Sequence, residues 1–232
     1  MTDEPTYGSL PSLHDAHPAA RGHFHGWLDE IDDELVGAAL LVSAALPRVT
    51  RAWVAADRGC IAETRTLNAD VCERVRRVET QGFLVLAREA PVAGDLRRLV
   101  AMLRLVTSVE RSAALLKHVA ETLERVDPRE LPEEIRLQAE DLGRRASEVF
   151  RQGVDAWRSR DGLAVRELDD ADEAVDALAI ALLEHADVVE SPGEAMSLAQ
   201  LARYWERIAD HGVSFAQHST FAVTGERVEV GH

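Results

Sequence analysis

A six-residue motif expected to be helical occurs twice in this chain, and the repetition constrains the fold more than any other feature of the sequence. Residues 109–114 read VERSAA and residues 205–210 read WERIAD, so the shared Glu-Arg pairs lie 96 positions apart. At the same offset Leu105 aligns with Leu201. A recurrence of this kind indicates two copies of one helical unit.

Apolar residues recur at helical spacing through most of the chain, and strand signals are absent. The pattern predicts helices over about 22–57, 60–88, 95–123, 133–159, 162–189 and 194–222. The breaks between them contain Gly or Pro, and the longest break, 126–132 (VDPRELP), separates two sets of three helices. The sequence therefore predicts an all-α fold of two tandem three-helix bundles.

These breaks also give the expected boundaries. A disordered N-terminal arm rich in Pro, His, Ser and Ala is expected over 1–21. The first three-helix repeat is expected over 22–126, the second over 131–222, and a C-terminal tail over 223–232.

Composition narrows the function. A formal net charge of −15 and a pI near 5.0 argue against a nucleic-acid partner, because phosphate binding needs a concentrated positive surface. No run of residues approaches the roughly 18 apolar residues of a membrane span, and the acidic, polar start of the chain is unlike a signal peptide. We therefore expect a cytoplasmic protein that is not inserted in a membrane.

The second helical unit carries two pairs of carboxylates at i, i+4 spacing. Asp172 and Asp176 lie one turn apart on the expected fifth helix, and Glu206 and Asp210 lie one turn apart on the sixth. The break at 191–193 makes these helices antiparallel neighbours, and the pairs are about 15 and 13 residues from it. Four carboxylates are therefore expected to meet across one helix–helix seam.

Such a cluster requires neutralisation, because neighbouring like charges disfavour one another's ionisation. A cation with oxygen ligands would supply it, and Arg203 and Arg207 are the competing source of positive charge. The plainer alternative is that these acids line a solvated helix edge. Asp is a poor helix former, however, and small residues flank Glu206, both of which favour a seam.

The first unit lacks this pattern. At an offset of 104, Asn68 and Cys72 stand opposite the two acids of the fifth helix. At the offset of 96 that relates the Glu-Arg pairs, Ala114 stands where the second acid of the sixth helix would be. Only Glu110 retains its carboxylate. Metal binding is therefore expected in the second half alone.

The histidines are weaker candidates. His23 and His25 could bind a metal, but histidines in a flexible arm are more simply incidental. His211 lies about 100° around the helix from Asp210, so it is expected to be a packing or surface residue. Three tryptophans are expected in the core: Trp53, Trp157 and Trp205.

Several segments together resemble the PhoU family. Residues 91–97 (PVAGDLR), followed without a gap by Glu110-Arg111, are similar to one family segment, and residues 204–211 (YWERIADH) and 223–226 (VTGE) are similar to the second repeat and its end. The resemblance covers about 22–226. It implies two three-helix bundles related by pseudo-twofold symmetry.

The resemblance also implies a function. Family members are non-enzymatic, usually dimeric cytoplasmic regulators that act as adaptors between a phosphate ABC transporter ATPase and a sensor histidine kinase, and they restrain the phosphate-starvation response. Their acidic motifs can bind metal, which here implies an iron, zinc or manganese ion. The positions that match in the second repeat are Asp172, Asp176, Glu206 and Asp210.

The sequence argues against two other functions and leaves a third as the alternative. A ferritin-like oxidase needs Glu-x-x-His on two helices, and the only such spacing is Glu229 to His232 in the tail. A metal-dependent hydrolase needs a nucleophile or open metal position beside a general base, and none can be assigned. A PhoU-like metal-binding interaction scaffold that serves a different transporter or kinase remains the alternative.

Overall fold

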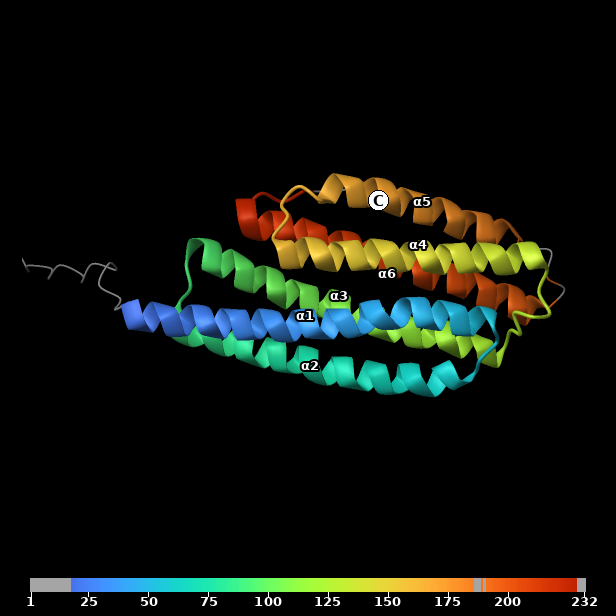
Figure 1. The fold of residues 1–232 in the computed structure, drawn as a ribbon, viewed down its shortest axis with the longest axis horizontal. Coiled ribbons are helices and arrows are strands. Elements are labelled where there is room, and N and C mark those ends of the chain that lie inside the picture. The colour runs from blue at the N-terminus through green and yellow to red at the C-terminus, as the bar shows by residue number, and fades with distance from the viewer. Residues whose placement is uncertain (1–17, 186–188, 190, 229–232) are drawn as a thin grey trace, which may run out of the picture.

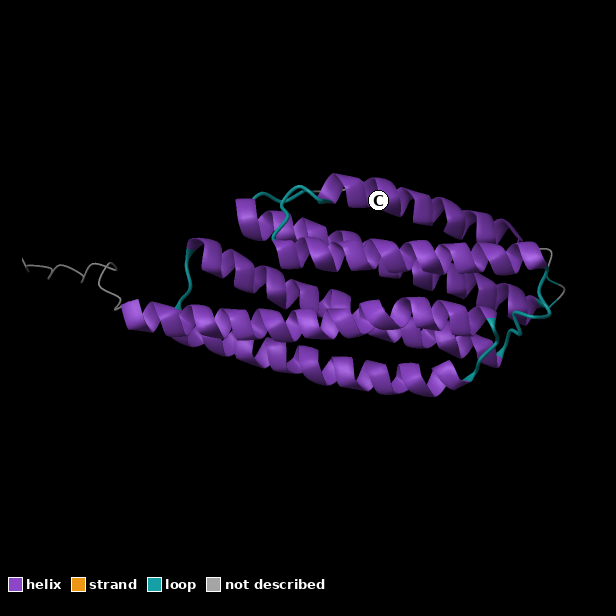
Figure 2. Ribbon diagram, in the orientation of Figure 1, coloured by secondary structure: helices purple, strands orange, loops and turns teal. Residues whose placement is uncertain are grey.

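The computed structural model is a bundle of six long α-helices (Figures 1 and 2), which confirms the predicted all-α class. It describes residues 18–185, 189 and 191–228, and these contain no strand. The helices are α1 (Pro18–Val54), α2 (Gly59–Glu89), α3 (Ala93–Glu121), α4 (Glu133–Ser159), α5 (Val165–Glu184) and α6 (Pro192–Thr224), with a 3-10 turn, η1 (Thr122–Glu124), after α3.

The observed helix ends differ from the expected ones in a few places. Residues 18–21, expected in the arm, belong to α1, and the rest of that arm, 1–17, lies outside the described residues. The fifth helix is shorter than expected, and residues 186–188 of its expected range are also outside them. α6 begins at Pro192 because Ser191 caps it, with the Ser191 Oγ accepting from the backbone N–H of Glu194. α6 ends where Gly225 adopts a φ of 84°, so the first residues of the expected tail are helical and 229–232 are not described.

The six helices form two halves that share one core. α1, α2 and α3 occupy the lower part of Figure 1 and α4, α5 and α6 the upper part. α1 packs against α4 and α3 packs against α6, so the buried side chains of both halves form one continuous cluster. α2 and α5 lie at the two outer edges, where each packs chiefly against the other two helices of its own half.

α4 and α6 approach each other closely at two glycines, Gly153 and Gly212. A Cβ added to Gly153 would lie 2.0 Å from the backbone oxygen of Gly212, and a Cβ added to Gly212 would lie 2.7 Å from the Cα of Phe150. Neither position has room for a side chain. Beside the two glycines, Phe150 and Phe215 pack edge to face with ring centroids 5.9 Å apart.

The three tryptophans expected in the core are buried there. The Trp53 indole N–H donates to Thr122 Oγ1 over 2.8 Å, within the first half. The Trp157 indole N–H donates to Asp32 Oδ1 over 2.7 Å and so links α4 to α1 across the two halves. Trp53 and Trp157 are 104 positions apart, which is the same offset that aligns Cys72 with Asp176.

By length and composition alone, Phe24–Val54 of α1 is apolar enough to cross a membrane, contrary to the expectation that no run of the sequence approaches a span. In the structure its apolar stripe packs into the core, where Leu28, Ile31 and Leu35 are at most 1% exposed. The composition of α1 is therefore accounted for by its position between the other helices.

The α4–α6 contact gives a direct test of the packing. Gly153→Ala should lower the free energy of unfolding by roughly 2 kcal/mol or more, because the added methyl group overpacks a backbone contact. In thermal melting this corresponds to a Tm lower by roughly 5 °C or more. The matched control is Gly26→Ala in α1, where a Cβ meets nothing within 4 Å. The control should be neutral or slightly stabilising, and an equal loss in both variants would contradict the assigned contact.

Candidate functional site

Three carboxylates meet across the seam between α5 and α6. Asp172 and Asp176 lie one turn apart on α5, and Asp210 lies on α6. One oxygen from each lies within 4.8 Å of one from each of the others. Asp172 is 1% exposed, whereas the other two are half-buried. The helical spacing read from the sequence thus brings three of the four predicted acids together.

Glu206, the fourth predicted acid, lies outside this group of three. Its carboxylate forms an ion pair with Arg203, one turn earlier on the same helix. Burial raises the pKa of Glu206, and the charges of Asp176 and Asp210 are close enough to add to the shift. Arg203 opposes that shift. Glu206 therefore lies at the edge of the cluster, held by the arginine that the sequence offers as an alternative to a cation.

The surroundings disfavour the ionised form of Asp172. Burial raises the pKa of Asp172 to about 7, and the negative charges of Asp210 and Asp176 add to the shift. The Asp176 Oδ1 atom is buried, and no hydrogen-bond partner for it is found among the described residues. The adjacent buried side chains are apolar, including Val175 on α5 and Ala209 on α6.

The donor set fits a divalent cation. Carboxylate oxygens bind Zn²⁺, Mn²⁺ and Fe²⁺ at about 2.0–2.2 Å, so oxygens that share one ion lie up to about 4.4 Å apart. The observed limit of 4.8 Å needs only a small side-chain rotation to reach that spacing. Asp172, Asp176 and Asp210 therefore form a candidate metal site.

The first half is built differently at the corresponding seam. The Cys72 thiol donates to Glu110 Oε1, with 3.7 Å between the two heavy atoms. Burial and the charge of Glu110 raise the pKa of Cys72, which keeps the thiol protonated as a donor. Within the described part of the chain one group of clustered acids is found, and it lies in the second half.

None of the described histidines belongs to the group of three carboxylates. His211 Nδ1 lies 2.8 Å from Ser112 Oγ on α3, and burial lowers its pKa to about 4, with Arg207 and Arg111 adding to the effect. It is a packing residue, as expected. His25 Nε2 lies 3.4 Å from Asp95 Oδ2 on α3, and the side chain of His23 is outside the described residues.

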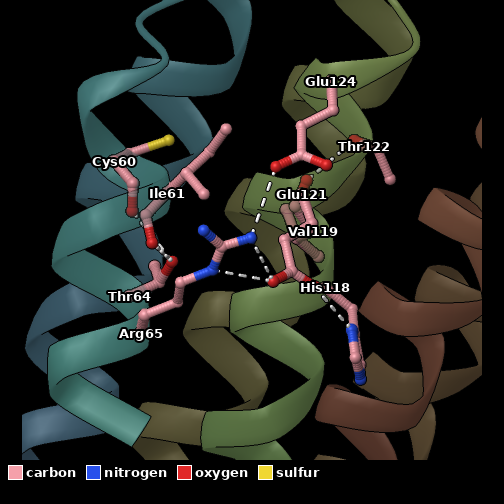
Figure 3. A network of polar contacts seen from close by, with 9 residues as sticks. All are labelled: Cys60, Ile61, Thr64, Arg65, His118, Val119, Glu121, Thr122 and Glu124. Atoms are coloured by element: carbon pink, nitrogen blue, oxygen red, sulfur yellow. Dashed lines mark hydrogen bonds and ion pairs between the residues drawn. The ribbon is translucent and has the colours of Figure 1, made fainter.

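Two networks of polar contacts were not predicted from the sequence. Arg98 on α3 contacts Asp29 and Asp32 on α1 and lines a cavity of about 620 Å³ between the halves. Arg65 on α2 binds Glu121 and Glu124 (Figure 3). The partners in each network are more than 50 residues apart in sequence, so no local spacing could have revealed them.

The raised pKa of Asp172 predicts a pH-dependent gain in stability from Asp172→Asn in metal-free protein. The folded chain holds a proton on this group up to about pH 7, whereas an unfolded Asp releases it near pH 3.9. Wild-type stability therefore falls as pH rises through that interval, and the penalty is complete above it. The variant should be more stable than wild type by on the order of a few kcal/mol at about pH 8, and by little at about pH 4.

Chemical denaturation at the two pH values measures this difference. Asp170→Asn, which removes an exposed charge from the same helix, is the matched control and should change stability by less than about 0.5 kcal/mol. A variant Asp172→Asn that is less stable than wild type at the higher pH would show that the cluster is not under electrostatic stress.

Comparison with known proteins agrees with the geometry of both halves. The PhoU domain profile matches residues 35–123 and again 139–218. The chain is 32% identical over 209 residues to the phosphate-specific transport system accessory protein PhoU homolog 1 of Mycobacterium leprae, covering 88% of this chain and 94% of that protein. It is 30% identical over 209 residues to PhoU homolog 2 of Mycobacterium tuberculosis, covering 88% of this chain and 98% of the relative.

Solved structures share the fold. The PhoU crystal structure from Pseudomonas aeruginosa superposes with a TM-score of 0.81 at 21% identity and covers 88% of this chain and all of that one. The phosphate transport system regulatory protein PhoU from Streptococcus pneumoniae superposes with a TM-score of 0.80 at 18% identity, covering 89% and 100%. With two matched PhoU domains and relatives aligned over nearly their whole length, the chain belongs to the PhoU family, whose members are regulatory proteins rather than enzymes.

Proposed function

We propose that this chain is a cytoplasmic, homodimeric accessory protein of a phosphate uptake system. In this role it acts as an adaptor between the ATPase of a phosphate ABC transporter and a sensor histidine kinase, and it restrains the phosphate-starvation response. The observation that carries the proposal is the match of both halves to the PhoU domain, because a protein that retains both repeats retains the whole scaffold. The names of its mycobacterial relatives, phosphate-specific transport system accessory proteins, support the same role.

Affinity capture tests the adaptor role. The tagged full-length chain would be recovered from its own cells grown with abundant phosphate and under phosphate starvation, and its partners identified by mass spectrometry. We expect the transporter ATPase and a sensor kinase, in amounts that change with phosphate supply. Recovery of a different transporter or kinase would favour the alternative of a PhoU-like scaffold with another client, and recovery of neither class would contradict the proposal.

We further propose that the chain binds one divalent cation, iron, zinc or manganese, in its second half. Asp172, Asp176 and Asp210 would be the ligands, because each offers an oxygen to a common centre. Glu206 would join them by turning from Arg203 towards the cluster. The cation would neutralise the charges that raise the pKa of Asp172 and so fasten α5 to α6.

Metal analysis tests this site. Chelator-free protein exposed to Fe²⁺, Zn²⁺ or Mn²⁺ and then desalted should retain about one equivalent of one of these metals. The double variant Asp172→Asn with Asp210→Asn should retain none, because carboxylate charge is what these cations select. Glu110→Gln, which alters the corresponding seam of the first half, is the matched control and should bind as wild type does. Wild-type protein without stoichiometric metal would contradict the site.

A further inference from the structure

α5 is the outer helix of the second half. At 20 residues it is the shortest of the six described α-helices. It lies at the outer edge of the second half and packs chiefly against α4 and α6 (Figure 1). Its apolar contribution to the core is a single stripe of buried residues: Val165, Leu168, Val175, Ala179 and Leu182.

α2, the corresponding edge helix of the first half, differs sharply in charge. The 31 residues of α2 contain five arginines and five acidic residues, whereas the 20 residues of α5 contain one arginine and seven acidic residues. α2 is therefore balanced, and α5 is strongly negative. This contrast matters because both helices occupy the same kind of position beside two partner helices.

Ion pairs fasten α2 to both of its neighbours. Arg65 reaches Glu121 and Glu124 at the end of α3 and in η1, with nitrogen–oxygen distances of 3.0 and 3.3 Å (Figure 3). Arg77 reaches Glu34 on α1 over 2.5 Å. These contacts join α2 to α1 and α3 without any ion from solution.

At the α5–α6 seam the fixed charges act in the opposite direction. Asp172 and Asp176 on α5 face Asp210 on α6, with oxygens within 4.8 Å of one another. Repulsion between like charges at this range favours separation of the two helices, and burial of Asp172 reduces the screening by water. The packing of the apolar stripe opposes that separation.

We propose that cation binding at this cluster controls how firmly α5 is held, so that α5 is a cation-gated element of the fold. With a cation bound, α5 is clamped to α6. Without a cation, α5 opens locally from α4 and α6 far more often and uncovers its apolar stripe, while α2 stays in place. This inference rests on the metal site proposed above and adds the local opening of α5, which metal binding alone does not require.

Hydrogen–deuterium exchange with mass spectrometry tests the proposal on the full-length chain. Chelated protein is compared with protein in Mn²⁺ at about one hundred times its dissociation constant, at about pH 8. A cation that binds only the closed state reduces the open population about a hundredfold at that excess, so amides of α5 that exchange through local opening should slow by about that factor. Peptides from α2 are the internal reference and should exchange at the same rate in both samples.

A charge variant tests the same mechanism without metal. In chelated protein, Asp172→Asn should slow exchange in α5 by about tenfold or more relative to wild type, because it removes the buried charge from the seam. Asp170→Asn, an exposed change on the same helix, should leave the rate within about twofold.

The outcomes separate this inference from the site on which it rests. If calorimetry shows that Mn²⁺ binds and α5 exchange is unchanged, the gating is wrong and the site stands. If α2 and α5 slow equally, the cation stabilises the whole bundle and the gating is again wrong. If none of Mn²⁺, Fe²⁺ and Zn²⁺ binds, both proposals fail.

Discussion

The position of Asp210 in the carboxylate cluster depends on the contact between α4 and α6 at Gly153 and Gly212. Because a Cβ fits at neither position, this contact fixes the rotation of α6 about its own axis. Successive helical residues are about 100° apart, so the two residues before Gly212 must face other neighbours. His211 faces α3, where it contacts Ser112, and Asp210 faces α5, where it joins the carboxylate cluster. The close contact at Gly212 on one side of α6 thus places the Asp210 carboxylate on the other side.

The two halves share an architecture, but the polar side chains between the outer helix and its neighbours differ. In the first half, arginines on α2 pair with acids on the adjoining helices, and the Cys72 thiol donates to Glu110 at the seam. In the second half the seam concentrates carboxylates, whose charges the cation that we propose would neutralise. Fold similarity to other PhoU proteins therefore does not make the halves equivalent, and the regulatory capacity that we infer is confined to the second.

Most of the fold could be predicted from the sequence, because helical periodicity and Gly or Pro breaks are local signals. The approach of Asp172 and Asp176 to Asp210 was also predictable, since a short connection sets the heights of residues in a helical hairpin. The placement of Glu206 was not, because its side chain chooses between the cluster and Arg203 by rotation, which the spacing leaves open. Contacts between distant segments, such as those of Arg65 with α3 and η1, produce no periodic pattern in the sequence and could not be predicted from it.

Anomalous X-ray diffraction from crystals of the chain grown with Mn²⁺ would show directly whether a cation binds at either seam. We expect one anomalous peak per chain, about 2.1 Å from carboxylate oxygens of Asp172, Asp176 and Asp210, and no peak at the seam that contains Cys72 and Glu110. A peak at the first-half seam, or well-ordered crystals with no peak between α5 and α6, would contradict the division of roles between the two halves.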